Sequence, residues 1–232
     1  VAIKGSISSQ FISSLLIIAP FASKKLKIKI IGRTVSKGYI TLTLNAIDKI
    51  RKSSRITVEG DFSSASYFIA LSLLTGAKIK IKNLNMKSAQ PDRAIVDILK
   101  KPLENAEIDI SNCPDLALTL GILGPSFGIT LRGTKRLADK ESNRAEALVK
   151  NLSKLGAKVK KGRNFIKIEK SKLRAGIINT FNDHRVAMSF AVLGASMDKG
   201  LIIKNIETVK KSYPNFLRDL KSLGANITII KH

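Results

Sequence analysis

The sequence predicts a mixed α/β fold that is built from a repeated unit, and three recurring features indicate it. A short segment that ends in Asp precedes an apolar helical segment three times, at Asp61, Asp115 and Asp183. Each apolar segment ends at a glycine and is followed by a strand pattern; these glycines are Gly76, Gly128 and Gly200. Asp is a favourable N-cap, and Gly readily takes the left-handed conformation that closes a helix. The pattern therefore marks where each helix begins and ends.

A second, amphipathic helix follows each of these strands. The three helices are expected at residues 93–101, 141–155 and 215–223. The last two end in the same tripeptide, Leu-Gly-Ala, and a further strand follows each. The repeated unit therefore reads as strand, helix, strand, helix and a strand pair.

Residues 1 to about 58 show the same order of sequence patterns as the repeats. They predict an apolar helix at 8–22, a basic strand at 25–31 and a helix near 39–50. This block resembles the last unit of a preceding domain. We expect residues 1–58 to end a first domain and residues 59–232 to form a second domain with three repeats.

Two strand pairs are missing from the pattern. Twenty-seven positions separate Gly156 from Asp183, enough for a strand pair, whereas Asp115 follows Lys101 after only fourteen. Residues 50–57 are shortened in the same way. Either the protein has lost two hairpins, or this chain directly joins residues that are separated by further segments in the complete protein. The second reading is favoured because deleting paired strands leaves unpaired sheet edges.

The amino-acid composition limits the classes of function that the chain can have. The 232 residues are 44% hydrophobic and 25% charged, which suits a folded core. Lys+Arg 41 against Asp+Glu 17 gives a net charge of +24, which indicates an anionic partner or simply a lysine-rich surface. Aromatic residues are only 5%, Trp is absent and the lysines are dispersed, which argues against nucleic acid.

Cysteine, histidine and hydropathy predict a cytoplasmic protein without a metal. The single Cys113 excludes an internal disulfide and fits a reducing compartment. His184 and His232 form no metal-ligand cluster with it. The longest apolar stretch, residues 11–22, is too short to span a membrane.

Two charged segments predict a site for a small, multiply charged anion. Lys140 and Arg144 stand one helical turn apart with Glu141 between them, and like charges at this spacing repel unless an anion separates them. Asp183, His184 and Arg185 open a very apolar helix, whose free N–H groups also attract anions. A carboxylate is then available for proton transfer.

Six motifs in order resemble the 5-enolpyruvylshikimate-3-phosphate synthase family. They are Ser8-Ser9-Gln10-Phe11, Val58-Glu59-Gly60-Asp61 with Ser63-Ser64-Ala65-Ser66-Tyr67-Phe68, Pro114-Asp115, Lys140-Glu141-Ser142-Asn143-Arg144, Asn182-Asp183-His184-Arg185 and Lys211-Ser212-Tyr213-Pro214. The resemblance implies an inside-out α/β barrel in each of two domains, with helices inside and sheets outside. It also implies that the full-length protein is a monomer. This chain would then cover the end of the first domain and the whole second domain.

The reaction implied is transfer of the enolpyruvyl group of phosphoenolpyruvate to the 5-hydroxyl of shikimate 3-phosphate, with release of phosphate, as a step of aromatic amino-acid biosynthesis. No cofactor or metal is implied. Asp115 matches the proposed proton acceptor and Glu141 the proposed proton donor. From the residues alone, Asp115 could instead be a helix N-cap and Glu141 a solvated acid in the first turn of a helix.

The resemblance also implies the substrate contacts. Those to shikimate 3-phosphate are Ser8, Ser9, Gln10, Ser36, Tyr39, Asp115 and Lys140. Those to phosphoenolpyruvate are Gln10, Arg144, Arg185 and Lys211. Each kind of residue also has a purely structural explanation. The serines could cap a helix, and Lys140 and Arg144 could lie on a solvated helix face. Arg185 could form a structural ion pair with Asp183.

The chain departs from the family pattern in places. Arg136 stands where a small polar contact such as Asn is common, and Gly38 stands where Pro is common. Asp139 and Asn143 replace the usual apolar residue and acid. The phosphate-binding motifs of the first domain are absent, so this chain alone is not expected to catalyse.

Three alternatives remain open. The sister enzyme that acts on UDP-N-acetylglucosamine shares the fold and the reaction. A nucleic-acid-end-processing protein of similar fold, such as an RNA-end cyclase, is supported only by the charge. A non-catalytic remnant gains weight if the chain is complete.

Overall fold

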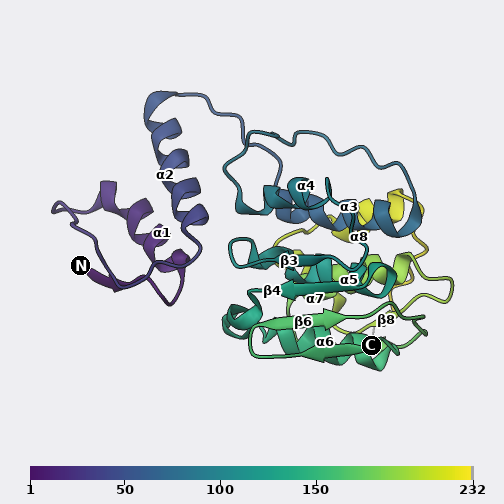
Figure 1. Cartoon of the computed structure of the whole chain (residues 1–232). Helices are drawn as coiled ribbons and strands as arrows, with labels where there is room; N and C mark the ends of the chain where they lie inside the picture. The colour runs from purple at the N-terminus through teal and green to yellow at the C-terminus, as the bar shows by residue number, and fades with distance from the viewer. Residues whose placement is uncertain (231–232) are drawn as a thin grey trace.

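A computed structural model describes residues 1–230, so His232 lies outside the described residues. Residues 1–52, here called the first unit, form a small α/β layer on the left of Figure 1. Its elements are β1 (Ala2–Lys4), α1 (Ser9–Ile18), the 3₁₀ helix η1 (Ala19–Phe21), β2 (Lys29–Ile31) and α2 (Lys37–Lys52). β1 and β2 pair in parallel, and α1 packs on α2.

Residues 59–230, the second unit, contain the three repeats. Their elements are α3 (Phe62–Thr75), η2 (Pro91–Arg93), α4 (Ala94–Ile98), β3 (Glu107–Asp109), η3 (Pro114–Leu116), α5 (Ala117–Phe127), β4 (Ile129–Arg132), η4 (Thr134–Asp139), α6 (Arg144–Lys154), β5 (Val159–Lys161), β6 (Phe165–Ile168), β7 (Ile177–Ile178), α7 (His184–Ala195), β8 (Ile202–Ile203), η5 (Ile206–Lys211) and α8 (Phe216–Ser222). The three expected apolar helices are therefore α3, α5 and α7.

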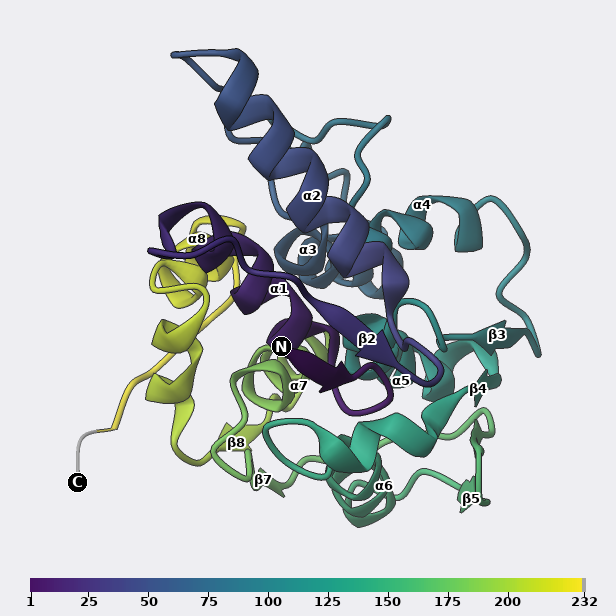
Figure 2. The same cartoon turned by 90° about the vertical axis from the view of Figure 1, so that its left-hand side faces the viewer.

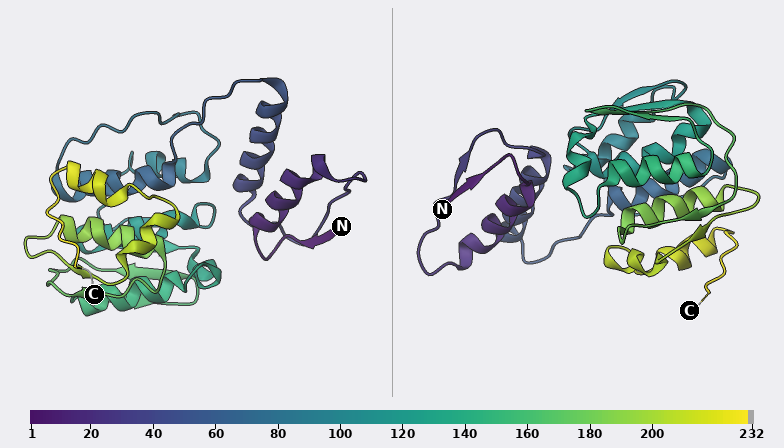
Figure 3. Two further views of the ribbon diagram at one scale, coloured as in Figure 1. Left: turned by 180° about the vertical axis from the view of Figure 1, so that it is seen from behind. Right: turned by 90° about the horizontal axis from the view of Figure 1, so that it is seen from below.

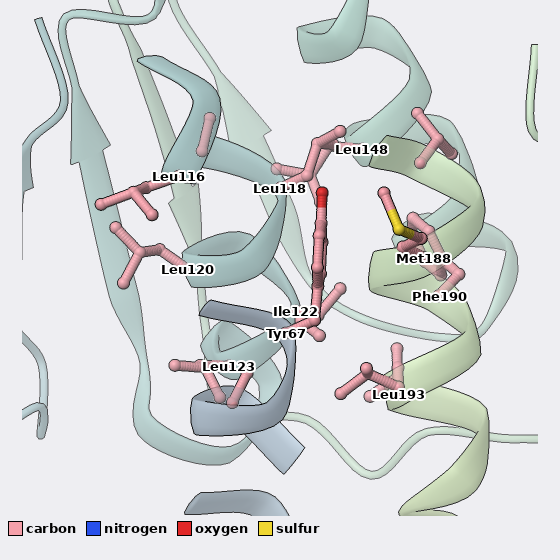
Figure 4. Close-up of a cluster of buried hydrophobic side chains, with 14 of the residues drawn as sticks. Tyr67, Leu116, Leu118, Leu120, Ile122, Leu123, Leu148, Met188, Phe190 and Leu193 are labelled. Carbon is pink, nitrogen blue, oxygen red and sulfur yellow. The ribbon is translucent and has the colours of Figure 1, made fainter. Parts of the chain in front are cut away.

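The helices lie inside and the sheets outside, as Figures 1 and 3 show. α3, α5 and α7 contact one another pairwise, and α5 is buried along almost its whole length. Leu118, Ile122, Met188 and Phe190 are among the side chains that fill the space between α5 and α7 (Figure 4). A helix that is apolar on every face is stable only when it is buried on every face. The predicted α/β class is confirmed.

One four-stranded sheet, in the order β3-β4-β6-β5, covers α5 and α6. β3 runs parallel to β4, and the other two pairings are antiparallel. In the β4–β6 pairing, Ile129 faces Ile168 and Leu131 faces Ile166, and all four side chains are fully buried. Because side chains alternate along a strand, this register puts the apolar face on the helices.

The strand expected after Gly76 is not formed. Residues 77–82 have no regular secondary structure and no ladder partner among the described residues. The chain also passes from α4 to β3 without a strand pair, whereas α6 is followed by β5 and β6. The missing pair removes the neighbour that this strand needs. Lys78, Lys80 and Lys82 point outward, and lysines on an exposed edge discourage pairing with another chain.

The helix expected from residue 141 begins later, at Arg144. Its N-cap is Asn143, whose side chain accepts a hydrogen bond from the Glu146 amide. Lys140 and Glu141 therefore precede the helix, so the prediction that Lys140 and Arg144 share a helical face is wrong. Within residues 1–230, no helix combines the length and apolar character needed to cross a membrane.

Candidate active site

Asp115 lies at the centre of a cluster of charges at one end of the central helices. Its Oδ1 is 3.2 Å from Lys140 Nζ and 2.8 Å from Arg144 Nη1, and its Oδ2 is 3.2 Å from Arg185 Nη2. The three cations come from the segment before α6, from α6 and from α7. In this structure the anion between Lys140 and Arg144 is the protein's own carboxylate, and the predicted site for a small, multiply charged anion stays a prediction.

The N-cap explanation does not hold for Asp115. The equivalent Asp61 and Asp183 cap α3 and α7, accepting hydrogen bonds from the amides of their helices. Asp115 instead lies inside the 3₁₀ helix η3, whose N-cap position belongs to Cys113. Of three aspartates at equivalent places in the repeat, Asp115 is the one whose carboxylate contacts all three cations. Asp183 contacts Arg144, whereas Asp61 caps its own helix.

The charge state of Asp115 follows from its neighbours. Burial alone would raise its pKa, but the charges of Arg185, Lys140 and Arg144 outweigh burial and lower the pKa to about 2. The side chain is 16% exposed, so water screens these interactions only weakly. Asp115 is therefore ionised at neutral pH and is a weak base while the three cations remain in contact with it.

Arg144 connects Asp115 with a second buried carboxylate. Its Nε lies 2.8 Å from Asp183 Oδ2 and its Nη2 lies 3.4 Å from Asp183 Oδ1. Asp183 has no exposed surface and also accepts hydrogen bonds from Ser142 Oγ and the Arg185 amide. Burial raises the pKa of Asp183, yet Arg144 and these hydrogen bonds hold it below the usual range. The side chain that pairs with Asp183 is thus Arg144, whereas Arg185 pairs with Asp115.

Glu141 forms a separate group beside the first. Its carboxylate pairs with Lys211, and its Oε2 lies 2.6 Å from His184 Nδ1. The residue lies at the surface, but Lys211 and His184 cover its side chain, which is only 21% exposed. Burial lowers the pKa of His184 in spite of Glu141, so the imidazole is neutral at pH 7. A neutral imidazole beside a carboxyl group offers a place where a proton can be held.

Glu141, Asp183 and His184 also bring possible metal-ligand atoms within 4.8 Å of one another. Lys211 and Arg144 already pair with the two carboxylates of this group. A metal ion would have to displace two cations, so the chemistry of the surroundings favours anions.

The first unit faces this end of the second unit (Figure 2), and two of its predicted site residues contact it. Ser36 Oγ accepts a hydrogen bond of 2.6 Å from Arg136 Nη1, and the Tyr39 hydroxyl donates to Asp92 Oδ1 at 3.2 Å. Burial and the nearby Asp92 raise the pKa of Tyr39, so its phenol stays protonated.

Ser8, Ser9 and Gln10 lie at the start of α1. Ser8 is its N-cap and accepts from the Gln10 amide, Ser9 is buried and Gln10 is exposed. The hydrogen bond described for this segment stays within α1, so the structure does not link the segment to the charged cluster.

Sequence reasoning missed Asp92. This buried carboxylate accepts hydrogen bonds from Tyr39 and from the Ser63 hydroxyl. Burial and the nearby Asp115 raise the pKa of Asp92 to about 6. A signal was available, because Pro91-Asp92 and Pro114-Asp115 are the same dipeptide, and each opens a 3₁₀ helix next to an α-helix.

Comparison with known proteins identifies the family. A sequence model of EPSP synthase (3-phosphoshikimate 1-carboxyvinyltransferase) matches residues 48–220. This chain belongs to the EPSP synthase family. The 3-phosphoshikimate 1-carboxyvinyltransferase of Clostridium novyi is 35% identical over 264 positions, which cover 97% of this chain and 60% of that protein. The protein of the same name from Methanocaldococcus jannaschii is 34% identical over 268 positions, covering 99% and 62%.

A solved EPSP synthase from Acinetobacter baumannii superimposes with a TM-score of 0.67 at 22% identity, over 76% of this chain and 48% of that one. The likeness shows a shared fold. The chain spans about 60% of the length of the curated relatives it matches. Within the family, the matched stretches of 264 and 268 positions exceed the 232 residues of this chain. The relatives therefore carry internal segments that it lacks, in keeping with the absent strand pairs.

Proposed function

We propose that the protein to which this chain belongs transfers the enolpyruvyl group of phosphoenolpyruvate to the 5-hydroxyl of shikimate 3-phosphate and releases phosphate. The observation that carries the proposal is Asp115, a carboxylate that three cations from three parts of the fold share. Family membership supplies the reaction, since the curated relatives are named for it. The cations suit the two anionic substrates, and the carboxylate suits the hydroxyl that must lose a proton.

In this proposal Asp115 accepts the proton of the 5-hydroxyl and Glu141 supplies a proton to the methylene carbon of phosphoenolpyruvate. Such acid–base help contributes roughly two to four powers of ten in rate. Asp115 is held ionised but weakly basic by its three cations. Substrate phosphate and carboxylate groups compete for the same cations. Their binding would therefore weaken the hold on Asp115 and raise its basicity at the moment when the hydroxyl arrives.

The remaining contacts divide between the substrates. Shikimate 3-phosphate would contact Ser8, Ser9, Gln10, Ser36, Tyr39, Asp115 and Lys140. Phosphoenolpyruvate would contact Gln10, Arg144, Arg185 and Lys211. Arg185 has the best electrostatic position, because it lies in the first turn of α7, where its charge adds to the free N–H groups of the helix.

We also propose that residues 1–58 end a first domain and residues 59–232 form a second one. A linker without regular structure follows α2 at residue 53 and supports this boundary. The single free Cys113 is buried and fits a cytoplasmic location. We propose a monomer that needs no cofactor and binds small molecules rather than nucleic acid.

Phosphate release tests the function. The full-length protein should release phosphate only when both phosphoenolpyruvate and shikimate 3-phosphate are present. Replacing the acceptor by UDP-N-acetylglucosamine should abolish release, and equal turnover of that acceptor would favour the sister reaction. No release with either acceptor would refute the proposal.

A further inference from the structure

The N-terminal turn of α2 makes two side-chain hydrogen bonds to the second unit. Arg136 Nη1, on η4, donates to Ser36 Oγ at 2.6 Å, and the Tyr39 hydroxyl donates to Asp92 Oδ1 at 3.2 Å. α2 packs on α1 but has no buried residue, and none of its side chains packs against the hydrophobic core that the structure describes in the second unit. These two bonds are therefore prominent among the interactions that orient the turn.

The backbone of the same turn approaches the second unit closely. A Cβ added to Gly38 would stand 2.9 Å from Pro91 Cγ, closer than real Cβ atoms come to other atoms. The proline ring is stiff and cannot swing away as a long side chain would. We call Ser36, Gly38 and Tyr39, together with the Arg136, Pro91 and Asp92 that face them, the turn junction.

Ser36 does not act as an ordinary helix cap. A serine N-cap has extended backbone angles, and its hydroxyl accepts from its own helix. Ser36 has a φ of 49° in the left-handed region, and its side chain makes no capping bond. Its hydroxyl is instead used by Arg136. A strained backbone at a non-glycine residue persists only when surrounding contacts hold it there.

Asp92 occupies its place at a cost in stability. It is 2% exposed, and the groups that face it are Tyr39 from α2, Ser63 from α3, Asp115 from η3 and Arg185 from α7. Burial and Asp115 raise its pKa, so ionisation at neutral pH opposes folding. A carboxylate that is kept where it costs stability is typical of a functional position.

We propose that Asp92 and Arg136 are positioning residues that hold the Ser36–Tyr39 turn in the orientation that binds the phosphorylated acceptor. The acceptor's identity rests on the proposed function, whereas the orientation of the turn does not. Neither Asp92 nor Arg136 is assigned a contact with the substrates.

The orientation is measured first, without any ligand. The exposed Lys25 in the first unit and Lys154 in the second are replaced by cysteines that carry spin labels. The native Cys113 is buried and should stay unlabelled. The distance between the two labels then reports how the units are oriented. The chain should give one narrow distance distribution. Asp92→Ala and Arg136→Ala, which each remove one partner of the two hydrogen bonds, should each lose it, and Arg136→Lys, which keeps a cationic donor, should recover part of it.

Matched controls separate this role from general destabilisation. Asp97→Asn and Lys135→Ala remove exposed charges nearby and should leave the distribution narrow. Gly38→Ala removes no charge or hydrogen bond and by itself favours the helix, yet it should also lose the narrow distance because of Pro91. A narrow distribution in Gly38→Ala, Asp92→Ala and Arg136→Ala alike would overturn the proposal.

Acceptor binding is measured second, by calorimetry with shikimate 3-phosphate. Asp92→Ala and Arg136→Ala should each weaken binding roughly fivefold to tenfold, the worth of one hydrogen bond, while the two controls bind normally. Unchanged affinity would overturn the positioning role. If the unaltered protein binds no shikimate 3-phosphate, the proposed function fails, and the distance measurement still decides whether the two residues orient the turn.

Discussion

Replacing Asp115 by Asn tests the charged cluster most sharply. The carboxylate has a pKa of about 2 in the folded protein against 3.8 in an unfolded chain. The difference corresponds to about 2.5 kcal/mol of stability, at about 1.4 kcal/mol per pKa unit. Asp115→Asn should lose about this much at pH 7, because the neutral amide resembles the protonated carboxyl group and leaves the three cations without their counter-charge.

The loss should depend on pH in a defined direction. The folded pKa is lowered, so the stabilisation is complete above pH 3.8 and disappears as the pH falls towards 2. Roughly half of it should remain at pH 3. Urea unfolding of Asp115→Asn and the unaltered chain at pH 7, 5 and 3 measures this difference. Added inorganic phosphate should recover more stability in the variant, since an anion can then occupy the vacated place among the cations.

Asp97→Asn is the control, since it removes one exposed carboxylate that pairs with Arg93 and Lys100. Exposed pairs contribute about 0–1 kcal/mol. If Asp115→Asn costs no more than this control, or if its cost does not change between pH 7 and pH 3, the reasoning about the three cations is refuted.

Three further predictions follow from the same structure. Asp92→Asn should stabilise the protein by up to about 3 kcal/mol above pH 6 and have no effect below pH 3.8, because the folded pKa of Asp92 is raised to about 6. Urea unfolding at pH 8 and pH 3.5 measures this change in stability, and a variant that is less stable at pH 8 would contradict the prediction. Glu141→Gln should slow phosphate release strongly in the full-length protein without changing the unfolding midpoint, and near-normal turnover would reject Glu141 as the proton donor. Gly124→Ala should destabilise by about 1–3 kcal/mol because its Cβ would meet Ile168 at 2.6 Å; thermal unfolding measures it, with exposed Lys150→Ala as the control, and equal midpoints would show that α5 and β6 can move apart.

Local sequence signals predicted the central helices well. Asp61 and Asp183 cap α3 and α7 as expected, and Gly76 and Gly128 close their helices in the left-handed conformation. These signals depend only on neighbours in the chain, so composition and spacing reveal them. The strand expected after Gly76 did not form because a strand needs a partner, and residues 1–230 offer none to this segment.

The candidate site was predicted in its members but not in its pairings. Lys140 and Arg144 were expected to face a small anion along one helical face, but in the structure both contact Asp115 and they do not share a helical face. Arg144 rather than Arg185 forms the side-chain pair with Asp183. Such pairings depend on how α5, α6 and α7 are placed in space, which residue spacing within one helix does not determine.

The turn junction shows the same limit. Gly38 and Arg136 were noted as departures from the family pattern, but nothing in the sequence connects two residues that lie almost a hundred positions apart. In the fold, Gly38 meets Pro91 and Arg136 meets Ser36. Two unusual residues thus contribute to the same contact between the units.

The central claim is that the charged cluster around Asp115 binds the acceptor. NMR mapping of the shikimate 3-phosphate binding site on the isotopically labelled protein tests this claim most directly. Binding at the proposed site should shift the resonances of Ser36, Tyr39, Asp115 and Lys140 together, and should move the Asp115 carboxyl signal as its cations turn to the ligand. Shifts confined to the lysine-rich surface of the first unit, or no shifts at all, would contradict the assignment of this charged cluster as the acceptor site.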